Sequence, residues 1–148
     1  LAVVPGTDGQ KMSKSYNNTI NMFASKKKLK KQIMGIVTDS TPLDEPKDPD
    51  NCNVFELYKL FADKEKQEEM RKNYLAGGYG YGHAKKELLN AILEYFKPYR
   101  EKRKELENNL DYVYNILDQG AKKARSIAIE KIKTIKKELG LLGNIYKK

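Results

Sequence analysis

The chain has 148 residues, and its 29 lysines and arginines outnumber 20 aspartates and glutamates for a formal charge of +9. This length suffices for one domain with a real core, and the charge favours a polyanionic partner, nucleic acid before an anionic membrane. No apolar run approaches the roughly 18 residues that a membrane-spanning helix needs, and we find no signal-peptide pattern. The single cysteine, Cys52, excludes an internal disulfide and a cysteine-only metal cluster, so a reducing cytoplasm is the expected compartment.

The first residues are apolar and are followed by a loop. Residues 1–4 are typical of the end of a buried strand or of a strand-to-loop exit, and the chain opens without methionine, so we expect a piece of a longer protein. In the loop from Pro5 to Asn18, Lys11 and Lys14 place two ammonium groups close to serine hydroxyls. Ammonium and hydroxyl groups on a glycine-hinged loop suit a highly charged anion such as a polyphosphate.

Residues 19–53 predict a short basic helix and then an acidic loop. Ser25 is a good N-cap for a helix of about ten residues with Leu29, Ile33 and Met34 on one face. Five lysines crowd this helix and oppose its dipole, which either a solvated basic face or a face that meets phosphate explains. Residues 38–53 hold three prolines and five acids, but their spacing does not match an EF-hand, so we expect a solvated loop.

Helical periodicity covers most of the remaining chain. Residues 54–62 and 64–76 predict two helices, and Asp63 is expected to cap the second one, with Met70 and Leu75 facing inward. The glycine-rich run 77–82 matches neither phosphate-binding fingerprint and predicts a tight connection between helices. A longer helical stretch over 83–108 follows, with Tyr99 expected in its apolar stripe, and Pro98 predicts a kink or break inside it. Since no convincing strand appears after residue 18, the expected fold class is all-α, a helical bundle preceded by the loop.

The last block, from residue 111 onward, predicts another helix. Small and apolar residues recur at helical spacing, which allows close approach of a second helix. Between residues 121 and 139, seven bases accompany only two acids. Bases late in a helix suit its dipole, but Lys122, Lys123 and Arg125 lie early in this basic run. We therefore expect these three side chains to contact nucleic acid.

One short motif identifies a family. Lys11-Met12-Ser13-Lys14-Ser15, with glycines before it and Asn17-Asn18 after it, resembles the KMSKS signature of class I aminoacyl-tRNA synthetases. The order of this loop, the basic helix, Thr38-Asp39-Ser40 and a terminal GAKKAR segment resembles the C-terminal part of the tryptophanyl-tRNA synthetases. The resemblance covers nearly the whole chain, and the GAKKAR segment distinguishes it best from the tyrosyl enzymes.

The resemblance implies an activity and its site. Members of the family use ATP and Mg²⁺ to convert tryptophan to its adenylate, and then transfer it to tRNA(Trp), as homodimers. The expected catalytic residues, which contact the ATP phosphates, are Lys11 and Lys14. The expected ATP-binding loop is completed by Met12, Ser13 and Ser15. The expected tRNA-binding residues, chosen from charge and position, remain Lys122, Lys123 and Arg125. No residues of this chain are expected to bind a metal, and no membrane is an expected partner.

The same resemblance divides the chain into three parts. Residues 1–18 would end a Rossmann-like catalytic domain, 19–53 would form the basic helix and acidic linker, and 54–148 would form a helical anticodon-binding domain. The family's HIGH motif and amino-acid pocket would precede Leu1, so we expect this piece alone to be inactive. Two alternatives remain open: a fragment of a tyrosyl-tRNA synthetase, and a standalone basic helical RNA-binding module in which KMSKS is coincidental.

Overall fold

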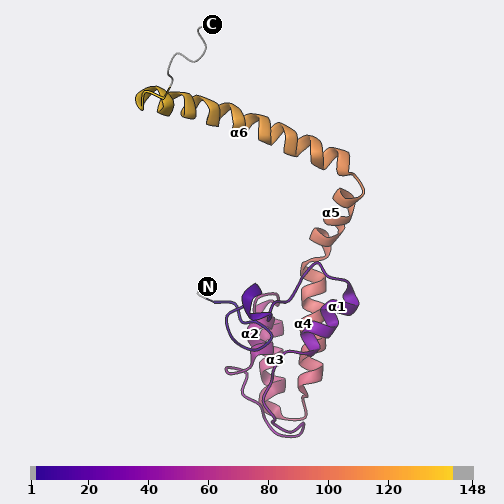
Figure 1. Ribbon diagram of the computed structural model, residues 1–148. Coiled ribbons are helices and arrows are strands. Elements are labelled where there is room, and N and C mark those ends of the chain that lie inside the picture. Colours follow the sequence, from indigo (N-terminus) through magenta and orange to yellow (C-terminus); the bar gives the residue numbers. More distant parts are fainter. Residues whose placement is uncertain (1–2, 142–148) are drawn as a thin grey trace. The chain divides into compact units, whose positions relative to one another are not determined.

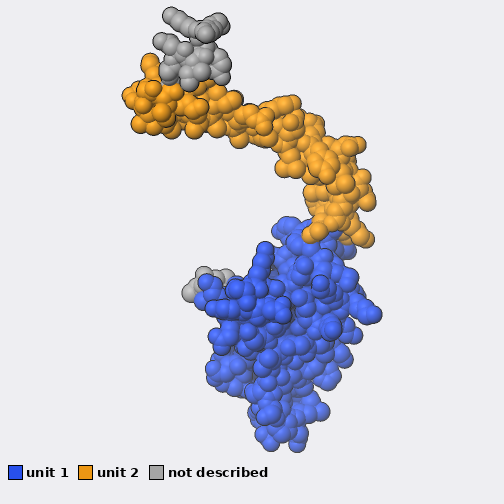
Figure 2. Space-filling view, in the orientation of Figure 1, with its two compact units in different colours: residues 1–100 blue, residues 101–148 orange. Residues whose placement is uncertain are grey.

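The computed structural model describes residues 3–141, and the chain divides into two compact units, residues 1–100 and residues 101–148 (Figures 1 and 2). Within residues 3–141 no strand forms beyond one isolated bridge between Pro5 and Lys11, so the all-α prediction is confirmed. The elements are the 3₁₀ turn η1 (Lys14–Tyr16) and the helices α1 (Lys26–Met34), α2 (Asn53–Tyr58), α3 (Lys64–Ala76), α4 (Tyr81–Tyr95), α5 (Lys97–Glu107) and α6 (Leu110–Glu138).

Helix α4 is the centre of the first unit, where it packs against α1 and α2 (Figure 1). Its apolar residues recur every three or four positions, so one face carries Ala84, Leu88 and Ile92, all fully buried. Leu29 and Ile33 of α1 complete this core from one side. Removing such side chains from water contributes roughly 1.5–3 kcal/mol each, and this burial positions the loop that precedes α1.

Most predicted helix ends are confirmed by their caps. The Ser25 hydroxyl accepts from the Lys28 amide at the start of α1, and the Asp63 carboxylate accepts from the Lys66 amide at the start of α3. The predicted break near Pro98 is also confirmed, since α4 ends at Tyr95 and α5 starts at Lys97. Proline is tolerated there because the first turn of a helix needs no amide donor at that position.

Several predicted inward residues face water instead. Leu75 and Tyr99 are about half exposed, and Met34 lies at the rim of the core. Tyr74, one residue before Leu75, takes the inward place on α3 because its ring packs edge-on against Phe55. Of the two predictions for residues 1–4, the buried strand end was wrong for Val3 and Val4, which are exposed. Residues 1–2 lie outside the described residues.

The acidic loop of residues 38–53 is more structured than its composition predicts. Lys47 is 3% exposed, and its ammonium donates to the carbonyls of Pro42 at 2.7 Å, Glu45 at 3.0 Å and Leu43 at 3.2 Å. Burying a charge requires such partners, since an unbonded ammonium is costly away from water. The single lysine of this acidic segment therefore folds the loop around itself.

In the second unit, α6 has no buried residue. Apart from the half-buried Val113, each of its side chains is exposed, including the apolar stripe that predicts a partner helix. Its N-terminus is capped by Asn109, whose side chain accepts from the Tyr112 amide at 3.3 Å.

Candidate functional site

The lysine- and serine-rich loop rises from a short hairpin-like base. The Met12 amide donates to the Val4 carbonyl at 2.8 Å, and the Gly6 amide donates to the Gln10 carbonyl at 2.7 Å. Gly9, at the tip, has φ +81°, which only glycine adopts without strain. These contacts give the loop a defined base in a region where the sequence predicts only a mobile connection.

Beyond the base, residues 13–17 form one tight turn. The Ser13 hydroxyl accepts from the Ser15 amide at 3.3 Å and lies 2.8 Å from the Ser15 hydroxyl. The turn η1 then ends at Asn17, which has the left-handed φ of 53° that asparagine tolerates better than most residues. The two serines are thus used first to shape the turn, and their hydroxyls lie together on one side of it.

The two lysines of the motif leave this turn toward solvent. Lys11 and Lys14 are exposed, whereas Met12 between them packs against the hydrophobic core. No ion pair joins either lysine to an acid anywhere in residues 3–141. The sequence holds no aspartate or glutamate between Asp8 and Asp39, so these charges are not neutralised locally. Such an arrangement favours a polyanion as ligand.

A buried asparagine, which the sequence reasoning did not select, stands at the neck of the loop. Asn18 is 2% exposed, and its side chain bonds to Asp8, Lys11 and Ser13. The bond from Asn18 is the main reason that the pKa of the exposed Asp8 carboxyl is lowered. The only sign of Asn18 in the sequence is its position, because it follows the KMSKS motif, which Gly6 and Gly9 precede.

Helix α1 adds a basic surface beside the loop. All five of its lysines are exposed, as predicted. A hollow of about 300 Å³ lies between α1 and the base of the loop, and it is lined by Thr7, Asn17, Thr19, Lys28, Lys31, Gln32 and Gly35. Its walls are held by the Gln32 side chain, which donates to the Thr19 carbonyl at 2.9 Å. No acidic side chain lines this hollow.

The predicted RNA-binding residues of α6 belong to the other compact unit. Lys122, Lys123 and Arg125 lie on its exposed surface. The Lys122 ammonium lies 2.6 Å from a carboxylate oxygen of Asp118, one turn earlier, so part of its charge is already compensated. The structure therefore brings together the five residues of the motif, whereas the RNA-binding set stands on a separate unit.

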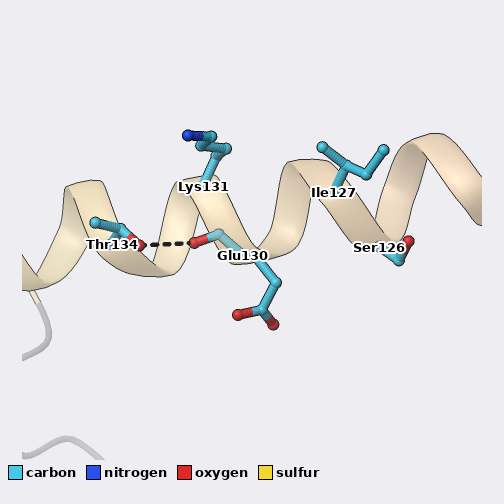
Figure 3. A pocket seen from close by; sticks show the side chains of 5 residues that line it. All are labelled: Ser126, Ile127, Glu130, Lys131 and Thr134. Atoms are coloured by element: carbon cyan, nitrogen blue, oxygen red, sulfur yellow. Dashed lines mark hydrogen bonds between the residues drawn. The ribbon is translucent and has the colours of Figure 1, made fainter.

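A hollow of about 450 Å³ further along α6 does not amount to a binding site. Figure 3 shows its lining side chains, which all come from consecutive turns of one helix and project outward from it. The hydrogen bond drawn there is internal to the helix, from the Thr134 hydroxyl to the Glu130 carbonyl at 3.0 Å. A single exposed helix offers no second wall that would enclose a ligand.

The tyrosines of the glycine-rich connection are structural. Tyr79 donates to Glu87 at 2.8 Å, Tyr81 donates to Asp39 at 2.7 Å, and both rings pack against Tyr74. Burial is the main cause that raises the pKa of the Tyr79 and Tyr81 phenols. These rings therefore contribute to core packing.

The residues of the loop do not fit a Mg²⁺ ion. Magnesium prefers carboxylate, carbonyl and phosphate oxygens, but the motif offers ammonium groups and hydroxyls that shape the turn. Within residues 3–141 no cluster of three or more histidine, cysteine, aspartate or glutamate side chains is suited to a metal. The ammonium groups of this loop suit an anion better than a cation.

Comparisons with known proteins point to one family. A family model described as class I tRNA synthetases (W and Y) matches residues 1–97. The tryptophan–tRNA ligase of Fusobacterium nucleatum is 68% identical over 145 residues, which cover 98% of this chain and 44% of that protein. The tryptophan–tRNA ligase of Rhodopirellula baltica is 53% identical over 140 residues, with coverages of 95% and 44%.

Solved structures agree with these relatives. A crystal structure of tryptophanyl-tRNA synthetase from Campylobacter jejuni matches with a TM-score of 0.90 at 54% identity, over 94% of this chain and 45% of that chain. A second structure from the same organism, described as a complex with ADP and tryptophan, matches with a TM-score of 0.89 at 54% identity, over 95% and 44%. The chain thus spans less than half the length of the relatives that it matches.

Within the described residues, no helix is long and apolar enough to cross a membrane.

Proposed function

Because the chain belongs to the class I tRNA synthetase family of the tryptophan and tyrosine type, we propose that it is part of a tryptophan–tRNA ligase. In this proposal the loop of Lys11 and Lys14 binds the ATP phosphates, and the helical region binds tRNA. The observation that carries the proposal is the pair of exposed, locally unneutralised lysines on a shaped KMSKS turn. The tryptophan rather than tyrosine specificity rests on the names of the relatives.

The loop would act on the first half-reaction. A carboxylate oxygen of tryptophan attacks the α-phosphorus of ATP, the bond from that phosphorus to the bridging oxygen breaks, and pyrophosphate leaves with the bonding electrons. Lys11 and Lys14 would stabilise the charge that develops on the leaving pyrophosphate, with Met12, Ser13 and Ser15 shaping the loop. Since this charge grows toward the transition state, the lysines lower the barrier more than they strengthen ATP binding.

The helical region would serve the second substrate. We assign Lys122, Lys123 and Arg125 to contacts with the phosphates of tRNA(Trp), since they are exposed and begin the basic run of α6. The three-part division into residues 1–18, 19–53 and 54–148 belongs to this proposal. The family resemblance also supports a cytoplasmic, homodimeric parent protein.

The activity is tested by ATP–pyrophosphate exchange in the full-length parent, with tryptophan and with tyrosine. We expect exchange that depends on tryptophan. Exchange with tyrosine alone would favour the tyrosyl alternative, and no exchange with either amino acid would favour the standalone RNA-binding module.

The role of the loop is tested by Lys14→Ala in the same parent. We expect adenylate formation to fall about 10²- to 10³-fold, the usual loss for a group that stabilises developing charge, and ATP affinity to fall far less. Lys131→Ala, an exposed lysine of α6, is the matched control and should leave both quantities unchanged. Equal losses of rate and affinity would contradict a role in the transition state.

The RNA contacts are tested by the double variant Lys122→Glu with Arg125→Glu. We expect weaker tRNA binding, with a shallower dependence on salt, and unaltered pyrophosphate exchange. The matched control is Lys133→Glu with Lys136→Glu, which makes the same charge change about three turns later on α6. Unaltered tRNA affinity in the first variant would show that Lys122 and Arg125 belong to a solvated face.

A further inference from the structure

A single buried amide stands where the two ends of the KMSKS loop meet. The Asn18 side chain is almost fully buried, and each of its polar atoms is bonded. Its Oδ1 accepts from the Ser13 amide at 2.8 Å, and its Nδ2 donates to the Lys11 carbonyl at 3.0 Å and to an Asp8 carboxylate oxygen at 2.8 Å. A buried amide that lacked these partners would be costly, so its bonds fix the geometry around it.

These bonds act on the backbone that carries the lysines. The Lys11 carbonyl and the Ser13 amide flank Met12, and one side-chain amide meets both, as a neighbouring peptide group would in a sheet. The Asn18 main-chain carbonyl also accepts from the Thr7 amide at 2.9 Å. Asn18 thereby holds the backbone on each side of the loop, while the side chains of Lys11 and Lys14 remain exposed.

The glycine before the motif is a second, independent sign that the neck is built around this amide. A Cβ on Gly6 would lie 2.4 Å from Asn18 Cγ and Nδ2, and 2.7 Å from the Asn18 main-chain oxygen. Real Cβ atoms essentially never come this close to other heavy atoms, so any larger residue would displace Asn18 or the backbone around Gly6. Only glycine, which has no side chain, lets the backbone at this position approach Asn18 so closely.

We propose that Asn18 is a positioning residue for adenylate formation, because it fixes the direction in which Lys11 and Lys14 leave the loop. The inference rests on the function proposed above, in which these lysines meet the pyrophosphate group of ATP. An error of about 1 Å in such a placement can cost on the order of 10² in rate, although the misplaced groups are still present. Asparagine suits this position because it donates and accepts at once. Aspartate cannot donate to the Lys11 carbonyl, and it would face the Asp8 carboxylate.

The test is Asn18→Asp in the full-length parent, followed by ATP–pyrophosphate exchange. We expect kcat to fall about 10²-fold, while KM for ATP changes less than about threefold and tRNA affinity is unchanged. Adding Asp8→Asn should restore about tenfold of the loss, because the new amide can donate to the carboxylate at position 18. Asn21→Asp is the matched control and should keep full activity, since Asn21 is exposed and its side-chain oxygen only accepts, from the Phe23 amide.

A role confined to folding predicts a different result. A folded Asn18→Asp variant with a normal kcat would overturn the proposal. If Asn18→Asp does not fold, the milder Asp8→Ala variant decides, and a wild-type kcat in that variant would also overturn the proposal. For Asp8→Ala, which removes one exposed partner of Asn18, we expect a three- to tenfold lower kcat. If the wild-type parent shows no tryptophan-dependent exchange, the proposed function fails. The positioning role of Asn18 is then tested by hydrogen exchange of the Ser13 amide. This exchange should be faster in Asn18→Ala, and an unchanged rate would refute the role.

Discussion

Helices α4 and α6 carry the same apolar residue types at the same spacing, yet Ile92 of α4 is fully buried and Ile132 of α6 is 49% exposed. The difference is due to their neighbours, since α4 packs between α1 and α2. A periodic apolar stripe therefore predicts an amphipathic helix, but it does not say whether the described chain provides the surface that covers the stripe.

Polar contacts differ between the two units in the same way. In the first unit some of them join residues far apart in the sequence, as where the Arg71 guanidinium donates to both carboxylate oxygens of Asp50 at 2.6 and 2.7 Å. Along α6 the ion pairs stay within a turn, as between Lys122 and Asp118. Such local pairs stabilise a helix by only about 0.2–0.5 kcal/mol each. Residues 1–100 are thus held by tertiary contacts, and α6 by local ones.

The largest expected effect comes from truncating one isoleucine in each helix. Ile92→Ala should lower the free energy of unfolding by about 2–5 kcal/mol, because it opens a cavity in a closed core. Ile132→Ala should lower it by less than about 0.5 kcal/mol, because that side chain is already half in water. Chemical denaturation of the chain measures both values. Similar losses would remove the contrast and show that the stripe of α6 is covered in solution.

Exchanging one buried lysine should have a smaller effect. The Lys85 ammonium donates to the Ile36 carbonyl at 2.7 Å and to the Met34 carbonyl at 3.2 Å, just beyond the end of α1. Lys85→Met should cost about 1–3 kcal/mol, since these carbonyls lose their donor. Lys86→Met, at the next and exposed position, should be nearly neutral in the same denaturation experiment. Equal effects would mean that Lys85 does not secure the end of α1.

Two glycines distinguish local from tertiary control. In α6, Gly120→Ala should stabilise the helix by about 1 kcal/mol, because the added Cβ meets open space. In the first unit, Gly77→Ala should be destabilising, because φ is +76° and the Cβ would lie 2.5 Å from the Asp44 carbonyl oxygen. Thermal melts followed by far-ultraviolet circular dichroism should show opposite shifts. Shifts of the same sign would contradict this division.

The smallest expected effect is electrostatic. The Arg71 guanidinium is the main cause that lowers the pKa of the Asp50 carboxyl below its usual value, so Arg71→Ala should raise that pKa. A carboxyl with a lowered folded-state pKa stabilises the fold above the unfolded pKa, and this stability is lost as the pH falls through the folded value. The stability difference between the wild type and Arg71→Ala should therefore shrink below about pH 4. A nuclear magnetic resonance titration of Asp50 measures the shift, and Lys72→Ala should leave it unchanged.

Sequence reasoning reached the caps and breaks of the helices because these depend on neighbouring residues. Ser25, Asp63 and Pro98 act on their own turns, and each was placed correctly. It failed at Leu75, since helical spacing cannot show which of two adjacent apolar side chains meets the core. It also missed Lys47, which composition places on a solvated loop and the fold places inside it.

For the candidate site, the chemistry follows from the residue types alone. Lys11, Ser13, Lys14 and Ser15 offer ammonium and hydroxyl groups at a spacing that suits phosphate, whatever the surrounding fold. How the ammonium and hydroxyl groups are held in place depends on the tertiary structure, because hydrogen bonds between residues that are separated along the chain produce no recognisable sequence pattern. In the sequence, Asn18 is one of two adjacent asparagines after the motif. Only the tertiary structure shows that Gly6 packs against it and that its side chain bonds to the backbone of the loop.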